Sequence, residues 1–144
     1  MAIMEPAAIP PGRGHLDPED RVRLLRLELL VDSRRFDEAQ EQAEDLWLEA
    51  VDAHKRLYQG LSNALTAVVA RLERKRRGAR EIAARTRQML APYPRRVLGF
   101  DLDALLDSVD DFVLRGEGPI LLLRQGGPGG VRALPITFAA DGMG

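Results

Sequence analysis

Apolar residues recur at intervals of three and four along most of the chain, which is the period of an α-helix. Asp17 and Pro18 predict the start of a first helix, because Asp suits the cap and Pro suits the first helical position. That helix is expected to run to about Val31. Its apolar side is expected to consist of Val22, Leu25, Leu29 and neighbouring leucines.

A second helix begins near Phe36 and carries the clearest apolar stripe of the chain. Small Ala39 and Ala43 should let another helix approach closely, and Trp47 should be the largest buried anchor. The whole stripe is Phe36, Ala39, Ala43, Leu46, Trp47 and Ala50.

A third helix starts around Ala53 or His54 and continues through Leu72 to the Arg-rich region. Gly60 lies inside it and costs about 1 kcal/mol relative to Ala, so a close helix crossing is expected there. Gly78 is expected to break or bend the pattern.

A fourth helix is predicted over 79–90 and a fifth over 102–114, the latter closed by Gly116. The fold class is therefore all-α: a compact bundle of about five helices over 17–116, in up-and-down succession. Residues 1–16 read as a flexible arm. Residues 117–144 read as a Gly/Pro-rich tail, either extended or folded as a small hairpin.

Composition supports this reading. Of 144 residues, 45% are apolar and only 5% aromatic, so the core must be built of Leu, Ala and Val, which favours helices. The absence of Cys excludes disulfides and thiolate metal sites. No basic leader or long apolar run is present, so we expect a cytoplasmic protein with no membrane partner. No cofactor signature is present, and none of the common catalytic motifs occurs.

Charge is segregated along the chain although the formal total is −1. Between Arg71 and Arg96 ten basic residues face two acids, a local charge of +8, with acidic segments on either side. A basic helix corner could bind the phosphate backbone of a nucleic acid, although only Tyr93 could stack on bases. The alternative is pairing with acidic helices of the same bundle or of a partner subunit. The nucleic-acid candidates are Arg74, Lys75, Arg76, Arg77 and Arg80.

A second candidate site lies on the helix that begins at Phe36. Gln40 and Glu44 fall on the border of its apolar stripe, Glu41 slightly further out, where they could line a semi-buried pocket. A hard metal ion could use Glu41 and Glu44 as weak ligand candidates, and a carboxyl beside Trp47 could act in acid–base chemistry. The alternative is that these groups only fix the packing. The full cluster is Glu38, Gln40, Glu41, Glu44, Trp47 and Gln59.

The same residues carry a family resemblance. The chain resembles the all-helical family known as domain of unknown function 309, over roughly Asp17 to Arg115. The resemblance rests on Phe36, Glu38, Ala39, Glu41, Glu44, Trp47, Gln59, Gly60, Leu61, Gly78, Ala79, Gly99, Phe100, Asp101 and Leu102. It implies a compact helical fold and supplies no reaction.

The chain departs from the family pattern in two places. Gln40 stands where the family commonly has His, and the basic run Arg74 to Arg77 replaces an expected Gly-Asn pair. A family site that needs an imidazole would therefore be lost. The leading hypothesis is a helical scaffold for interaction with itself or another protein. Nucleic-acid binding and a metal-dependent or acid–base site are the alternatives.

Overall fold

The computed structural model describes residues 18–122, and this part of the chain is all-α, as the sequence predicts. The arm over 1–16 and the segment 123–144 lie outside the described residues. No helix between 18 and 122 is long and apolar enough to cross a membrane. The elements are α1 (Pro18–Asp32), α2 (Phe36–Glu49), α3 (Asp52–Leu72), α4 (Arg76–Leu90), β1 (Arg96–Val97), β2 (Phe100–Asp101) and α5 (Leu102–Arg115).

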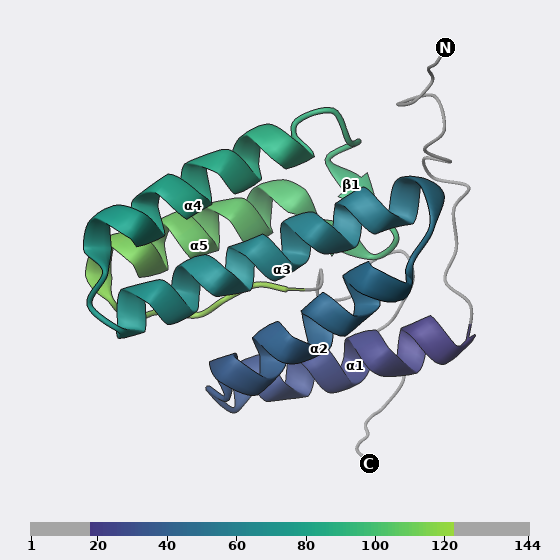
Figure 1. Ribbon diagram of the computed structural model, residues 1–144, viewed down its shortest axis with the longest axis horizontal. Helices are drawn as coiled ribbons and strands as arrows, with labels where there is room; N and C mark the ends of the chain where they lie inside the picture. The colour runs from purple at the N-terminus through teal and green to yellow at the C-terminus, as the bar shows by residue number, and fades with distance from the viewer. Residues whose placement is uncertain (1–17, 123–144) are drawn as a thin grey trace.

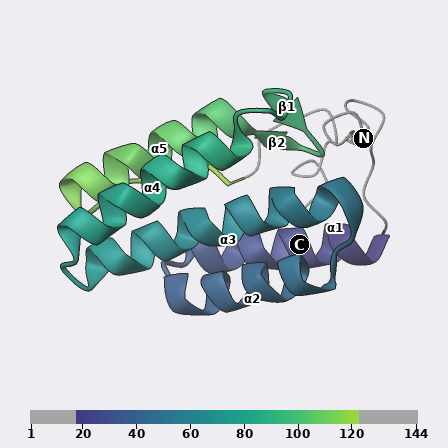
Figure 2. The same ribbon diagram turned by 45° about the horizontal axis from the view of Figure 1, so that its top comes forward.

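The long helix α3 organises the bundle. Helices α2 and α4 both pack extensively along α3, and Figure 1 shows α3 running between them. Helix α5 contacts both α4 and α3, whereas α1 contacts α2. The strands β1 and β2 form a small antiparallel pair at the end of the α4–α5 hairpin (Figure 2). The sequence predicts only a turn and cap at Gly99 to Asp101, so the β1–β2 pair is a feature that the sequence analysis does not predict.

The expected close crossing at Gly60 is confirmed. A Cβ built on Gly60 would lie 2.5 Å from Cδ2 of Leu90, which is fully buried on α4. The absence of a side chain at Gly60 is therefore what allows α3 and α4 to approach at this point. The gain in packing offsets the cost of glycine inside a helix.

The expectation for Trp47 is wrong, because its side chain is only half-buried at the edge of the core. The largest fully buried side chains are those of Tyr58 on α3 and Phe100 on β2. Phe36 and Phe112 meet edge to face with ring centroids 5.6 Å apart, which joins α2 to α5.

The predicted apolar side of α1 is wrong for Val22 and Leu29, whereas Leu25 is partly buried against the core. Leu24, Leu27 and Val31 are buried, whereas Val22 is 53% exposed and Leu29 is 66% exposed. Apolar residues surround this helix on more than one side, so the pattern contains two stripes at the helical period. Helix α2, with which α1 makes its main helix contact, covers only one of them.

The break between α3 and α4 occurs before Gly78, which lies within the first turn of α4. Arg74 adopts a left-handed conformation with φ of 68°, and the N–H of Lys75 donates to the carbonyl of Ala70 at 2.9 Å. The N–H of Arg74 donates to the carbonyl of Arg71, which completes a Schellman motif. An Arg therefore occupies the position where glycine is usual, and for this reason the sequence places the break too late.

The start of the predicted tail belongs to the core. Ile120 and Leu122 are buried, and the N–H of Leu121 donates to the Ser108 hydroxyl at 3.0 Å. Residues 117–122 contain no strand. The remainder of the tail, where the hairpin is expected, lies outside the part of the chain that the structure describes.

Candidate binding surface on helices 4 and 5

The carboxylates of α2 face solvent. Glu38, Glu41 and Glu44 are all exposed, and Glu38 pairs with Arg35 at 2.6 Å one helical turn away. Glu41 and Glu44 have no ion pair or hydrogen bond within residues 18–122. No group of three His, Asp or Glu side chains in that range is placed to hold a metal ion.

Gln40 has a packing role. It is half-buried, and its Nε2 donates to the Thr66 hydroxyl at 2.9 Å, which in turn donates to the carbonyl of Ser62. Gln59, on the next helix, is also half-buried. These contacts join α2 to α3, whereas the exposed Glu41 and Glu44 lack the apolar surroundings that acid–base chemistry by a carboxyl requires.

Eight of the ten basic residues of the stretch form two groups, of which the first contacts α5 or its first turn. Arg71 Nε donates to the carbonyl of Val113 at 2.9 Å, and Arg95 pairs with Asp103 at 3.0 Å. Arg87 binds Asp110 at 2.7 Å and Asp107 at 3.0 Å. These hydrogen bonds to Asp110 and Asp107 raise the pKa of Arg87 above its ordinary value, against the opposing effect of burial.

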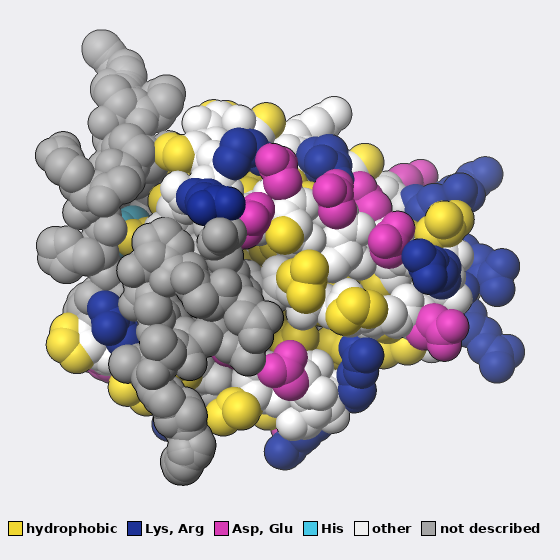
Figure 3. Space-filling view, turned by 180° about the vertical axis from the view of Figure 1, so that it is seen from behind, with side chains coloured by type: hydrophobic (Ala, Val, Ile, Leu, Met, Phe, Trp, Pro, Cys, Tyr) yellow, Lys and Arg dark blue, Asp and Glu magenta, His cyan; other side chains and the backbone are white. Residues whose placement is uncertain are grey.

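The second group forms what we call the basic corner, at the turn between α3 and α4. All of its side chains are exposed, and Figure 3 shows Lys and Arg gathered at this end of the molecule. Lys75 pairs with Glu73 at 3.2 Å, and its four neighbours have no ion pair within residues 18–122. The basic corner consists of Arg74, Lys75, Arg76, Arg77 and Arg80.

The position of the basic corner is unfavourable for the helix that carries it. Helices α1, α2 and α5 have acids in their first turns, whereas α4 has none and begins with Arg76 and Arg77. Cations at a helix N-terminus oppose the macrodipole, and Lys75 supplies no side-chain cap. Arg76 and Arg77 therefore do not stabilise the start of α4, and in the basic corner only Lys75 has an ion pair within residues 18–122.

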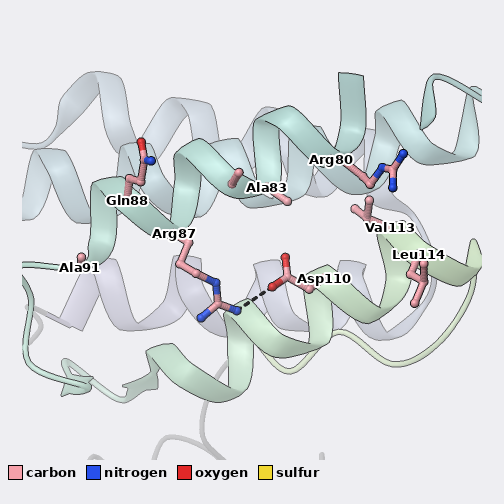
Figure 4. Close-up of a pocket in the computed structure, with 9 residues that line it drawn as sticks. Arg80, Ala83, Arg87, Gln88, Ala91, Asp110, Val113 and Leu114 are labelled. Atoms are coloured by element: carbon pink, nitrogen blue, oxygen red, sulfur yellow. Dashed lines mark hydrogen bonds and ion pairs between the residues drawn. The ribbon is translucent and has the colours of Figure 1, made fainter. Parts of the chain in front are cut away.

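A groove of about 630 Å³ runs between α4 and α5 (Figure 4), and the sequence does not reveal it. Val113 and Ala83 are buried beneath it, and Leu114 is 69% exposed along its wall. Arg80 stands at one end and belongs also to the basic corner. The lining residues are Arg80, Ala83, Ala84, Arg87, Gln88, Ala91, Asp110, Val113 and Leu114.

The groove has a sequence signal that is visible only in retrospect. Ala84 and Ala91 recur on one side of α4, where small side chains leave space beside α5. An alanine pattern alone does not show which neighbour faces it. The Arg87–Asp110 ion pair crosses the groove and fixes the spacing of its two walls (Figure 4).

Comparison with known proteins gives no relative: no family model, no curated protein and no solved structure matches the chain.

Proposed function

We propose that this protein is a helical interaction module and that its binding surface is the α4–α5 groove together with the basic corner. One observation supports this proposal most strongly: an apolar surface lies next to an unpaired cation. Leu114 is exposed, small side chains form the floor of the groove, and Arg80 beside them has no counter-ion among residues 18–122. An apolar floor with a cationic rim suits an amphipathic helix that carries acids at one end.

The size of the groove supports this proposal. Arg80 on α4 and Ala91, the residue that caps its C-terminus, are eleven positions apart, which corresponds to about 16 Å at the rise of an α-helix. Three turns of a partner helix would fit along this length. The aligned Ala84 and Ala91 would allow the close approach that a third helix needs beside α4 and α5.

The test is selection of binders from a random peptide display library on the purified protein. The selected peptides should combine an apolar helical face with acidic residues. Ala84→Trp fills the groove from an exposed position and should abolish their binding. Arg85→Trp places the same indole at an exposed α4 residue outside the groove lining and should leave binding intact. Equal binding to both variants would contradict the proposal.

Nucleic-acid binding is the second candidate, and the unpaired cations of the basic corner favour it. Its test is fluorescence anisotropy of labelled single- and double-stranded nucleic acid at about 50 and about 200 mM salt. Binding that collapses with salt and disappears in Arg77→Glu, but persists in Arg96→Glu at the exposed β1 position, would support this candidate. Absence of binding at the lower salt concentration would eliminate it.

We also propose that the chain belongs to the family it resembles. The support is the combined pattern of Phe36, Trp47 and the Gln59 to Leu61 segment. That membership would account for the helical fold and supplies no activity, so the proposed interaction role does not depend on it.

A further inference from the structure

Two helices of this chain present exposed faces of opposite charge. On α2 six acids are exposed, of which Glu38 and Glu49 have ion pairs. The other four have no ion pair within residues 18–122: Asp37, Glu41, Glu44 and Asp45. On α4 the exposed Arg76, Arg77 and Arg80 are likewise without ion pairs in that range. Charge on both faces that residues 18–122 leave uncompensated is available for a contact with another molecule.

The two faces cannot meet within one molecule. Helix α3 lies between α2 and α4 and packs against both (Figure 1). Because α2, α3 and α4 follow one another in alternating directions, α2 and α4 both begin at the same end of the bundle. The acidic first turn of α2 and the basic first turn of α4 therefore lie on opposite sides of α3.

The order of residues along the two helices is complementary. On α2 the acids Asp37, Glu41 and Glu44 are followed by Leu48, which is 59% exposed although it is apolar. On α4 the cations of the first two turns are followed by the alanines of the groove. Along this row of α2, and along the groove side of α4, the charges without an ion pair among residues 18–122 precede the apolar residues, over about 16 Å.

We propose that the α4–α5 groove receives α2 of a second copy of this chain. The two helices run parallel, so that the carboxylates of Asp37 and Glu41 lie against Arg77 and Arg80. Leu48, seven residues after Glu41, then lies near Gln88 and Ala91, at the end of the groove away from Arg80. This inference rests on the proposed function, for which it names the partner. The acidic face of α2 and the α4–α5 groove are different surfaces, so in a two-fold symmetric dimer each chain places its α2 in the groove of the other. The dimer therefore contains the contact twice.

The experiment is sedimentation velocity on the full chain at low and high salt, with two charge reversals, Glu41→Arg on α2 and Arg80→Glu on α4. The wild-type protein should associate at low salt and dissociate at high salt. Each single reversal should weaken association by about tenfold or more, and the double variant should recover most of the loss, because it restores opposite charges across the contact. Arg26→Glu, at an exposed α1 residue outside both faces, is the matched control and should behave as wild type.

A reversal that unfolds the protein would mimic loss of association, so circular dichroism must accompany each variant. Leu48→Ala provides a second route, since it removes an exposed side chain and should weaken association without lowering thermal stability. A wild-type protein that remains monomeric at low salt would overturn the inference. So would a double variant that associates no better than the single ones.

The inference and the proposed function can fail separately. A monomeric protein that still selects acidic peptides in an Ala84-dependent manner overturns the second copy as the partner and keeps the interaction surface. A monomeric protein that selects no peptides overturns both.

Discussion

Gly60 on α3 lies directly against Leu90 on α4, so that a Cβ at Gly60 would stand 2.5 Å from Cδ2 and 2.8 Å from Cγ of Leu90. Leu90 is fully buried and cannot swing into solvent. The pair sets the separation of the two helices near the C-terminal end of α4. That separation determines where the far end of the binding groove lies relative to α3.

Gly60→Ala should lower the free energy of unfolding by about 1 to 2 kcal/mol, because overpacking outweighs the gain in helix propensity. Gly78→Ala is the control, since a Cβ there would meet nothing closer than 4.0 Å. It should raise stability by up to about 1 kcal/mol. Urea unfolding of both variants measures the difference, and a stabilised Gly60→Ala protein would contradict the close crossing.

Arg74→Gly should stabilise the protein by about 1 kcal/mol, since glycine accepts the left-handed conformation without a steric penalty. Arg34 has a similar φ of 63° in the α1–α2 turn, yet its Nη1 donates to the carbonyl of Gly118 at 2.8 Å. Its guanidinium also lies 5.7 Å from the ring centroid of Phe36. Arg34→Gly should therefore gain less or lose stability, which thermal unfolding would reveal.

The contrast between these two arginines bears on function. The side chain of Arg34, a residue with a left-handed backbone, makes contacts that offset the strain, whereas the side chain of Arg74 makes no hydrogen bond or ion pair within residues 18–122. A residue that adopts an unfavourable backbone conformation without a stabilising side-chain contact is a candidate for a binding role. Arg74→Gly should therefore be more stable and should bind an acidic or phosphate-bearing partner less well.

Ser108→Ala should cost about 1 to 2 kcal/mol, because the N–H of Leu121 would lose its acceptor beside the core. Thr86→Val is the comparison, since the hydroxyl of buried Thr86 donates only to the carbonyl of Ile82 within the same helix. Loss of the Thr86 hydroxyl should lower the free energy of unfolding by less than Ser108→Ala does. Hydrogen exchange of the Leu121 amide should accelerate in the Ser108 variant alone. An unchanged rate would show that the hydroxyl does not hold this segment.

Leu27→Ala should lower stability by about 2 to 5 kcal/mol, whereas Leu29→Ala should change it by less than about 0.5 kcal/mol. The two leucines lie two residues apart on α1, and only Leu27 is in the core. Chemical denaturation of the two variants, Leu27→Ala and Leu29→Ala, tests which apolar stripe of α1 faces α2. Equal losses would indicate that the stripe containing Leu29 is covered in solution.

Local signals predict the helix boundaries well where they are strong. Asp101 caps α5 by accepting from the N–H of Ala104 at 3.0 Å, and Gly116 ends that helix with a φ of 84°. The start of α4 is missed because Arg74, a residue with no turn preference, takes the left-handed position. The β1–β2 pair is too short to leave a periodic signal.

The candidate site is less accessible from sequence, because it depends on how helices pair. Periodicity places Gln40 correctly at a helix border, and the structure gives it a hydrogen bond to Thr66. Periodicity cannot show that α5 takes Arg71, Arg87 and Arg95 as partners. It also cannot show that the four arginines of the basic corner have no ion pair within residues 18–122. Nor can it show the groove, which exists only between two helices that are eleven residues apart in the chain.

The segment after α5 has a consequence for the order of folding. Gly118 accepts a hydrogen bond from Arg34 across 84 positions of sequence, while Leu121 binds Ser108 across 13. The pairs α1–α2, α2–α3 and α3–α4 can each form through contacts close in sequence, which folds rapidly. Closing the loop between Arg34 and Gly118 costs more chain entropy. We therefore expect the helical hairpins to assemble first and the segment 117–122 to dock last. Its contacts with Arg34 and Ser108 would then join the α1–α2 turn to α5.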